Sequence, residues 1–304
     1  MKFLLTPKND YVFKKLFAEH PDLLIDLINC VLSLPPSARI VSVKIKNPDI
    51  PPDEIDKKFI TLDIRAVDSA GNGYDIEMQV RKYENYPKRS LYYLCKMYGD
   101  QLKSGEEYGE LHPVIGIHFL DYRQFPEHSG FHYHFRLRDR DCPDLVFTDD
   151  LSLHIFELRG IEKHMKEKKM TDLLEWLHFF NHAHEEGEKA MRTYYSNPMI
   201  NQAFDALETM SADRVTRDFA ERREKALKDE TMFLNEARRL GRKEGKIEGK
   251  IEGKVEGKIE GKTEEKRETA LRLLGMKFLT AEQIASATDL DIKEIEKLKS
   301  GIPA

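Results

Sequence analysis

The chain has few cysteines, no long uncharged hydrophobic run and no excess of positive charge. Its three cysteines, Cys30, Cys95 and Cys142, are odd in number and widely spaced over 304 residues. This spacing excludes a disulfide framework and a zinc-binding pattern, and it favours a reducing cytoplasm. No segment approaches the length needed to span a bilayer. The opening five residues are followed at once by proline and charged residues, so no signal peptide is expected.

The balance of charge gives no global reason to expect nucleic-acid binding. Lysine and arginine total 49 against 54 acidic residues, for a net charge of -5. Proteins that bind nucleic acid usually carry a basic patch or stripe, so binding here would need local basic groups or a metal ion. Glycine-rich phosphate loops and nucleophile-elbow motifs are also absent. The length suits one full core with a smaller appendage.

Two short alternating segments form the most informative pattern. Thr61–Arg65 and Tyr74–Val80 each alternate polar and apolar residues, and the turn-forming Asp68–Gly73 lies between them. This pattern predicts a β-hairpin whose acidic and apolar side chains lie on opposite faces. Asp63 and Glu77 then share one face, where two hard oxygen ligands are suitable for Mg²⁺. The opposite face, expected to be buried, carries Leu62, Ile64, Ile76 and Met78.

The hairpin alone has a simpler explanation. Antiparallel hairpins commonly turn one polar face to water, and Asp63 and Glu77 are compatible with such a face. Asp75 lies on the same face as Glu77, one strand step closer to the turn, and is interpreted as a rim acid.

Several further motifs accompany the hairpin in a fixed order. They are Leu5–Phe17, Asn47–Pro48 with Pro51–Pro52, Leu62–Ala66, Tyr86–Tyr93 and Pro113–Ile115. Together with Glu77-Met78-Gln79 they resemble the recombination-promoting nuclease/putative transposase (Rpn) family of the PD-(D/E)XK nuclease superfamily. The resemblance covers about the first two-thirds of the chain.

The resemblance implies a metal-dependent DNA endonuclease linked to recombination, mobile elements or defence against phage. It implies Mg²⁺, or another divalent cation such as Mn²⁺, held by Asp63, Glu77 and the backbone carbonyl of Met78. Gln79 stands where the superfamily has lysine, which puts the reaction rate in doubt. Asp10 matches an acidic N-terminal position of the family, but it also suits a first-turn acid that interacts with the helix dipole. The implied catalytic residues are Asp63, Glu77, Gln79 and Asp10.

Possible DNA contacts follow the hairpin. Arg89, Tyr93 and Lys96 are spaced four and three apart, so they share one helix face. They can contact phosphate or stack on a base, although a solvated helix face gives the same spacing. Lys14 is a weaker candidate. The alternative function is a catalytically decayed protein that binds DNA or assembles with other copies.

The remaining pattern predicts an α/β (α+β) fold, a PD-(D/E)XK restriction-endonuclease-like core sheet flanked by helices. Helices are expected over residues 7–33, as one helix or a pair, and over Lys88–Lys103. The expected strands are Ile40–Ile45, Phe59–Val67, Gly73–Arg81, Val114–Leu120, Phe131–Leu137 and Leu153–Leu158.

An all-helical C-terminal region is expected to follow the nuclease-like domain of residues 1–195. It comprises a helical region at 196–240, a Gly-Lys-Ile-Glu repeat at 241–262 and a small tail at 263–304. Glycine at every fourth position disfavours a helix by about 1 kcal/mol each. The repeat is therefore either a solvated linker or a helix whose apolar ridge pairs with a partner. We expect a homodimer through this region.

The tail and the histidines give weaker signals. Thr280–Gln283 is a capping-box start, and the tail has helix-turn-helix-like spacing, although its second helix is acidic for DNA reading. His132 and His134 share a strand face, and His178 and His182 lie one helical turn apart. Neither pair has a third ligand at suitable spacing, so neither predicts a metal site.

Overall fold

The computed structural model describes residues 4–55, 57, 63–167, 170–185 and 195–300. It divides into two units, Met1–Glu230 and Thr231–Ala304. The first contains the sheet and every sequence-predicted site residue. The second contains only helices among its described residues.

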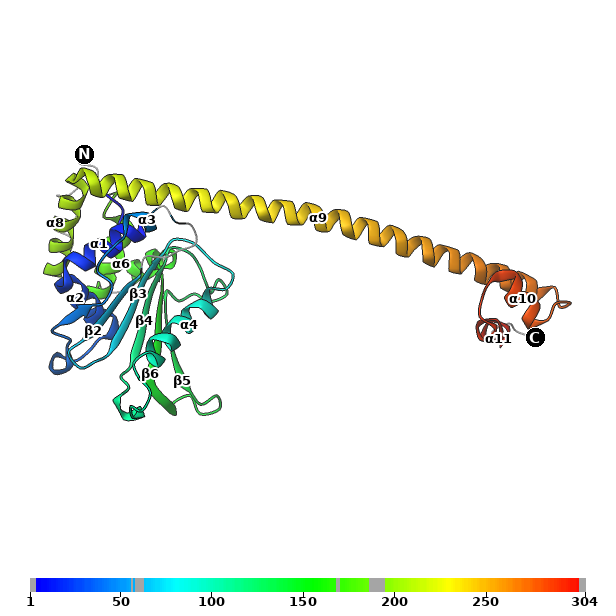
Figure 1. The fold of residues 1–304 in the computed structure, drawn as a ribbon, viewed down its shortest axis with the longest axis horizontal. Coiled ribbons are helices and arrows are strands. Elements are labelled where there is room, and N and C mark those ends of the chain that lie inside the picture. Colours follow the sequence, from blue (N-terminus) through cyan, green and yellow to red (C-terminus); the bar gives the residue numbers. More distant parts are fainter. Residues whose placement is uncertain (1–3, 56, 58–62, 168–169, 186–194, 301–304) are drawn as a thin grey trace. The chain divides into compact units, whose positions relative to one another are not determined.

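A six-stranded mixed sheet forms the centre of the first unit (Figure 1). The strand order is β1-β2-β3-β4-β6-β5. The strand β2 pairs antiparallel with both β1 and β3, and β4 pairs parallel with both β3 and β6. The edge strand β5 pairs antiparallel with β6. The strands are β1 (Val43–Ile45), β2 (Ile64–Asp68), β3 (Gly73–Gln79), β4 (Val114–Leu120), β5 (His132–Arg138) and β6 (Val146–Glu157). The strands β3 and β4 lie at the centre of this order, and every residue of both is buried, so both of their faces are covered.

Helices cover both faces of the sheet. On one face α1 and α2 contact β1, β2 and β3, and α6 and α8 pack against these helices; on the other, α4 contacts β3, β4 and β6. Their bounds are α1 (Asp10–Glu19), α2 (Pro21–Leu32), α4 (Tyr86–Gly99), α6 (Asp172–His182) and α8 (Pro198–Ala212). Shorter elements are α3 (Pro52–Ile55), α5 (Ile161–Glu167) and the 3₁₀ turns Pro36–Ala38, Tyr108–Glu110 and Leu158–Gly160. The predicted fold class is confirmed.

Local sequence explains where the first elements begin and end. Asn9 caps α1 by accepting hydrogen bonds from the backbone of Tyr11 and Val12, and Pro21 then starts α2, so residues 7–33 form a helix pair. In the β2–β3 turn, the Asp68 carboxylate accepts from the backbone N–H of Ala70 at 2.8 Å. Gly71 in this turn has φ of 91°, a value that favours glycine.

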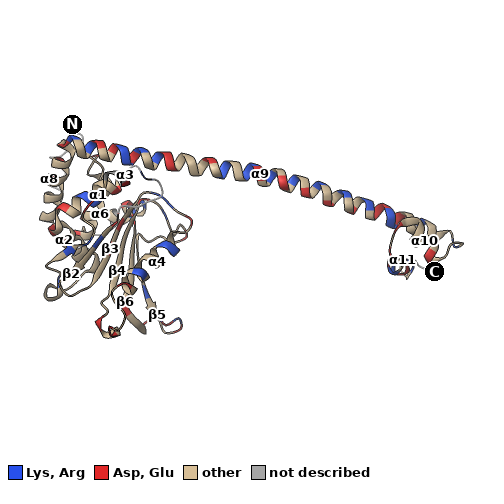
Figure 2. Ribbon diagram, viewed as in Figure 1, with Lys and Arg blue, Asp and Glu red and all other residues tan. Residues whose placement is uncertain are grey.

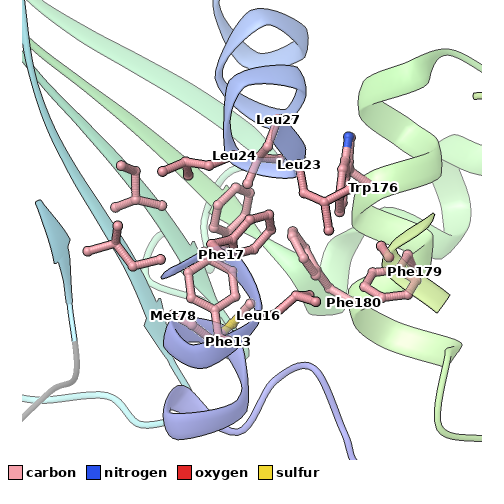
Figure 3. Packing of buried hydrophobic residues seen from close by; sticks show 14 of the residues in the cluster. Phe13, Leu16, Phe17, Leu23, Leu24, Leu27, Met78, Trp176, Phe179 and Phe180 are labelled. Atoms are coloured by element: carbon pink, nitrogen blue, oxygen red, sulfur yellow. The ribbon is translucent and has the colours of Figure 1, made fainter. Parts of the chain in front are cut away.

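The apolar face of the hairpin lies in the main core. Ile64, Ile76 and Met78 are fully buried, as expected, while Leu62 lies outside the described residues. Aromatic rings from α1 and α6 fill the space against the sheet; Phe13 and Phe180 have centroids 5.6 Å apart, and Phe119 of β4 stacks on Phe156 of β6 at 5.2 Å. Figure 3 shows this layer of side chains between the sheet and its helices.

Several element boundaries differ from the prediction. β1 begins at Val43 instead of Ile40, because Ile40 exchanges hydrogen bonds with the side chain of Asn29 and leaves the ladder. β6 begins at Val146, seven residues before the expected start, because its early, partly exposed residues pair with β5. The helix expected over Lys88–Lys103 runs over Tyr86–Gly99, with Pro87 inside its first turn.

The repeat is helical. α9 runs from Arg214 to Gly275, and its residues up to Glu230 belong to the first unit. In the second unit, the end of α9 packs with α10 (Ala281–Thr288) and α11 (Ile292–Ser300) around a small core of Ala270, Ile284 and Ile295. The predicted capping box at Thr280 and Gln283 is present. Within the described residues, no helix combines the length and apolar character needed to cross a membrane.

Replacing Ile64 with alanine tests the assignment of strand faces. Because Ile64 is fully buried in the main core, Ile64→Ala is expected to lower the free energy of unfolding by about 2–5 kcal/mol. Urea denaturation followed by circular dichroism measures this loss, and the exposed Val41→Ala is the control expected to change little. Equal stability of Ile64→Ala and the parent chain would mean that the faces are reversed.

Candidate functional site

The polar face of β3 is buried. Asp75, Glu77 and Gln79 point away from the main core, yet their side chains are only 1%, 4% and 3% exposed. They are covered because α4 packs over β3 and β4 on this face. Gly116 of β4 permits the close packing, since a Cβ there would lie 3.2 Å from Leu94 of α4 and 2.6 Å from Leu153. The hairpin is therefore not an ordinary solvated one, and its acids need partners.

Glu77 has two donors. Its Oε2 atom lies 3.4 Å from the Arg89 guanidinium of α4, and it also accepts a close hydrogen bond from the Gln79 side-chain amide. The Arg89 guanidinium lies 5.3 Å from the centroid of the Tyr83 ring, which supports its position. A cation from α4 therefore stands beside Glu77, while Gln79 contributes an amide where the superfamily has lysine.

His118 joins this group from the neighbouring strand. It lies opposite Glu77 in the parallel β3–β4 register and is fully buried. Its Nδ1 atom is 2.8 Å from the Tyr86 hydroxyl, and its Nε2 atom is 3.6 Å from Oδ2 of Asp75. Burial alone would lower the pKa of His118, but the charges of Glu77 and Asp75 outweigh it and raise that pKa above its ordinary value.

Asp75, Glu77 and His118 form a candidate metal centre. Each offers one ligand atom, and these atoms all lie within 4.8 Å of one another. Both carboxylate oxygens of Asp75, Nε2 of His118 and Oε1 of Gln79 are buried without a hydrogen-bond partner among the described residues. Such groups are costly to bury. Carboxylate oxygens and an imidazole nitrogen are common ligands of divalent cations, so this donor set fits a divalent metal.

Asp63 lies just before β2 and has partners of its own. Its Oδ2 atom accepts from Arg65 Nε at 2.8 Å, and its Oδ1 atom accepts from the Asn47 amide at 3.3 Å. Ile64 and Ile76 form the last pair of the hairpin. Asp63 and Glu77 are therefore the residues at the next position, one beyond the last pair. Among the described residues, the ligand atoms that gather within 4.8 Å do not include those of Asp63. Its role as a metal ligand stays a prediction.

Asp10 is held by a buried arginine. It is the first residue of α1, and its carboxylate receives Arg223 Nε at 2.9 Å and Nη2 at 2.7 Å. Both side chains are almost fully buried, and Arg223 Nη1 also donates to the carbonyl of Lys57 at 2.8 Å. Arg223 belongs to α9, so this contact ties the start of that helix to α1. The geometry gives Asp10 a structural partner, and its catalytic role stays a prediction.

The other predicted residues are spread over a wider area. Tyr93 lies near Arg65, whose guanidinium is 5.8 Å from its ring centroid, while Lys96 pairs with Asp100 on the exposed side of α4. Lys14 is buried; its burial lowers its pKa, partly opposed by the charge of Asp63. The Met78 side chain lies in the main core (Figure 3). Of the four residues predicted to contact DNA, all within the described part of the chain, Arg89 is the one that forms an ion pair with Glu77.

The histidine pairs noted in the sequence lie elsewhere. His132 Nε2 is 3.0 Å from His154 Nδ1, and the rings of His134 and His154 stack at 3.9 Å. These three histidines line a cavity of about 680 Å³ whose lining includes none of Asp63, Glu77 and Gln79. In the other pair the rings of His178 and His182 lie 4.6 Å apart, but each has a different partner, since His178 bonds the Tyr195 hydroxyl and His182 bonds Glu162.

Sequence reasoning gave no site role to His118, Tyr86 or Arg223, although Tyr86 begins one of the family motifs. His118 had one detectable signal, because it is the only titratable residue in the apolar run Val114–Leu120. Its alignment with Glu77 depends on the register of a parallel pair, which hairpin patterns do not give. Asp75 was interpreted as a rim acid, but it is buried against His118 and belongs to the candidate centre.

Breaking the Asp10–Arg223 pair tests its structural role. Arg223→Ala is expected to lower the free energy of unfolding by about 3–5 kcal/mol, because it leaves the Asp10 carboxylate buried without its cation. Thermal or urea denaturation measures the loss. The double variant Asp10→Leu/Arg223→Met should recover much of it, and a single variant as stable as the parent chain would contradict the assignment.

Comparison with known proteins agrees with the fold. A family model described as PD-(D/E)XK nuclease family transposase matches residues 7–237. Neither the curated proteins nor the solved structures gave a significant match. The match covers the whole sheet, α4 and the start of α9, which is well over half of the chain. The chain therefore belongs to the PD-(D/E)XK nuclease family transposases.

Proposed function

We propose that the protein is a divalent-metal-dependent DNA endonuclease that hydrolyses phosphodiester bonds. The observation that carries the proposal is Glu77, buried beneath α4 with unpartnered donor atoms of Asp75 and His118 beside it, in a member of a nuclease family. Asp63, Glu77 and the Met78 carbonyl are the ligands of Mg²⁺ or Mn²⁺ that the family pattern implies, and the buried atoms of Asp75 and His118 lie beside Glu77 as further donors. A divalent ion bound there would lower the pKa of water and offset charge that develops on phosphate.

The residues of this chain have separate tasks in the proposal. Arg89 keeps a positive charge beside Glu77 and supplies part of the electrostatics that lysine provides elsewhere in the superfamily. Gln79 orients the Glu77 carboxylate through its amide. Arg65 holds the Asp63 carboxylate in a charge-assisted hydrogen bond. Each acid is thereby fixed in direction before substrate binds.

DNA is the proposed substrate, contacted by Arg89, Tyr93, Lys96 and Lys14. The net charge of -5 makes such local cations necessary. By its family we also propose a role in recombination, with mobile elements or phage defence as its settings. The three free cysteines suit a cytoplasmic location.

A plasmid-cleavage assay tests the proposal. The full chain is incubated with supercoiled plasmid in Mg²⁺ or Mn²⁺, and nicked and linear products are quantified. Asp63→Ala and Glu77→Gln are each expected to reduce the rate by about 100-fold or more, because each removes a charge at the reacting centre. A chelator should abolish cleavage, and the exposed Glu127→Gln should leave the rate unchanged. Cleavage that survives chelation, or that persists in both acid variants, would overturn the proposal.

Gln79 favours a second candidate, a DNA-binding or assembly protein whose catalytic site has decayed. Without the motif lysine, the site lacks one positive charge near the scissile phosphate. This candidate predicts no metal-dependent cleavage but retention of DNA that weakens steeply with salt. The same preparations, tested for DNA retention between about 50 and 200 mM salt, separate the two candidates.

We further propose that the protein forms a homodimer through α9. Ile247, Ile251, Val255 and Ile259 form a ridge at four-residue spacing, and their exposed fractions are 51–60%. Lysine precedes each ridge residue and glutamate follows it, so one flank of the ridge is basic and the other acidic. Figure 2 shows both charges alternating along α9. In a parallel pair, the basic flank of each helix meets the acidic flank of its partner, whereas an antiparallel pair opposes like charges. Charge complementarity therefore favours a parallel dimer.

Light scattering tests the dimer. The full chain should be dimeric at tens of micromolar protein, and Ile251→Lys/Val255→Lys should make it monomeric because it places charge in the ridge. A paired cysteine test gives the orientation: Ile247→Cys should form an intermolecular disulfide only if the helices are parallel, since an antiparallel pair would separate the cysteines by about 18 Å. A monomeric parent chain would contradict the proposal, and a dimer unaffected by the lysines would place the interface elsewhere.

A further inference from the structure

The buried side chains of Asp75 and His118 beside Glu77 indicate which metal ion the site prefers. We propose that Asp75, Glu77 and His118 together bind a divalent transition-metal ion, represented by Mn²⁺, in preference to Mg²⁺. The inference rests on the proposed function for the use of the metal, but the donor set stands on its own geometry. In this donor set His118 binds the metal through Nε2, and Tyr86 positions the His118 ring.

The facing atoms of Asp75 and His118 are buried and make no hydrogen bond within the described residues. Asp75 is 1% exposed and His118 is fully buried, and the atoms they direct toward each other, Asp75 Oδ2 and His118 Nε2, are 3.6 Å apart. That distance is too long for a hydrogen bond. Neither these two atoms nor the second oxygen of Asp75 has a hydrogen-bond partner among the described residues. Two fully buried groups whose facing atoms make no hydrogen bond, with Glu77 adjacent, form an arrangement that a bound cation can satisfy.

The three candidate ligand atoms are close enough together to bind one ion. The three candidate ligand atoms lie within 4.8 Å of one another. Ligands of one ion at about 2.0–2.2 Å each are separated by at most about 4.4 Å. Small side-chain adjustments therefore bring all three atoms onto one ion, with no change in the strands that carry them.

The Tyr86 hydroxyl orients the imidazole ring of His118. Tyr86, in the first turn of α4, has its hydroxyl 2.8 Å from His118 Nδ1. When Nδ1 carries the proton and donates it to the hydroxyl oxygen, the lone pair of Nε2 faces Asp75 and Glu77. Metal-binding histidines are typically held by such a partner on the second nitrogen. Tyr86 thus fixes the direction of the ring, and its hydroxyl can accept the Nδ1 proton in the tautomer that binds metal.

The imidazole nitrogen of His118 determines which metal ion the site prefers. Mg²⁺ is a hard cation that prefers oxygen ligands and near-ideal octahedral geometry. An imidazole nitrogen in the donor set favours transition metals, whose affinity for nitrogen exceeds that of Mg²⁺. A site made only of Asp63, Glu77 and a carbonyl would not discriminate in this way. His118 is therefore the residue that sets the selectivity.

Metal binding to the full chain tests the inference. Mn²⁺ and Mg²⁺ are titrated separately by calorimetry, and bound Mn²⁺ is followed independently by electron paramagnetic resonance. The parent chain should bind Mn²⁺ at least about 10-fold more tightly than Mg²⁺. His118→Ala should weaken Mn²⁺ binding by about 10–100-fold and Mg²⁺ binding by less than about 3-fold, so the preference is lost.

Two further variants control for folding and position. Tyr86→Phe keeps the ring and removes only the hydroxyl, and it should weaken Mn²⁺ binding by about 10-fold while circular dichroism stays unchanged. His178→Ala is a matched control, because His178 Nδ1 also bonds a tyrosine hydroxyl, that of Tyr195, at 2.7 Å. It should leave both metal affinities unchanged. Mn²⁺ affinity that is the same in Tyr86→Phe, His118→Ala and the parent chain would overturn the inference.

The outcomes separate this inference from the proposed function. Metal-dependent DNA cleavage with no effect of His118 on Mn²⁺ binding would retain the nuclease and overturn the mixed donor set. Selective Mn²⁺ binding through His118 without DNA cleavage would support the donor set and overturn the nuclease.

Discussion

The burial of Glu77 between β3 and α4 is the constraint on which the site depends. A carboxylate covered by a helix must be matched by nearby donors, and the chain supplies Arg89 from α4 and Gln79 from the same strand. Gly116 on β4 favours this close cover, because a Cβ there would lie 2.6 Å from Leu153 and 3.2 Å from Leu94, and these side chains would have to shift. Close packing of α4 thus sets the position of Arg89, and it places Tyr86 against His118.

A second constraint links the candidate site to the helices that follow the sheet. Arg223 of α9 is fully buried against Asp10 at the start of α1, and Glu230 of α9 bonds the Tyr83 hydroxyl at 2.8 Å. Tyr83 also supports Arg89 through its ring. The first turns of α9 are therefore structural parts of the first unit, and the family match, which extends to residue 237, includes them.

Much of the fold follows from local patterns, whereas the site depends on contacts between distant segments. The alternation of Tyr74–Val80 and the turn at Asp68–Gly73 predicted the hairpin and its buried apolar face, because strand period and turn chemistry are local properties. The same alternation could not show that the polar face is also buried, since the cover comes from α4. Nor could it align His118 with Glu77, because a parallel register is set by packing across a crossover. The helical state of the Gly-Lys-Ile-Glu repeat was similarly undecided, since glycine entropy competes there with the helix propensity of lysine and glutamate.

The central claim is that the buried polar face of β3 is a metal centre. Anomalous diffraction from crystals of the full chain grown with Mn²⁺ tests it most directly. The account predicts an anomalous peak about 2.0–2.3 Å from a Glu77 carboxylate oxygen, with Asp75 and His118 Nε2 as neighbouring ligands. A peak held by Asp63 and Glu77 without His118 would leave a metal centre with a different donor set. The absence of any peak at Glu77, with Asp75 and His118 joined directly by a hydrogen bond, would contradict the account.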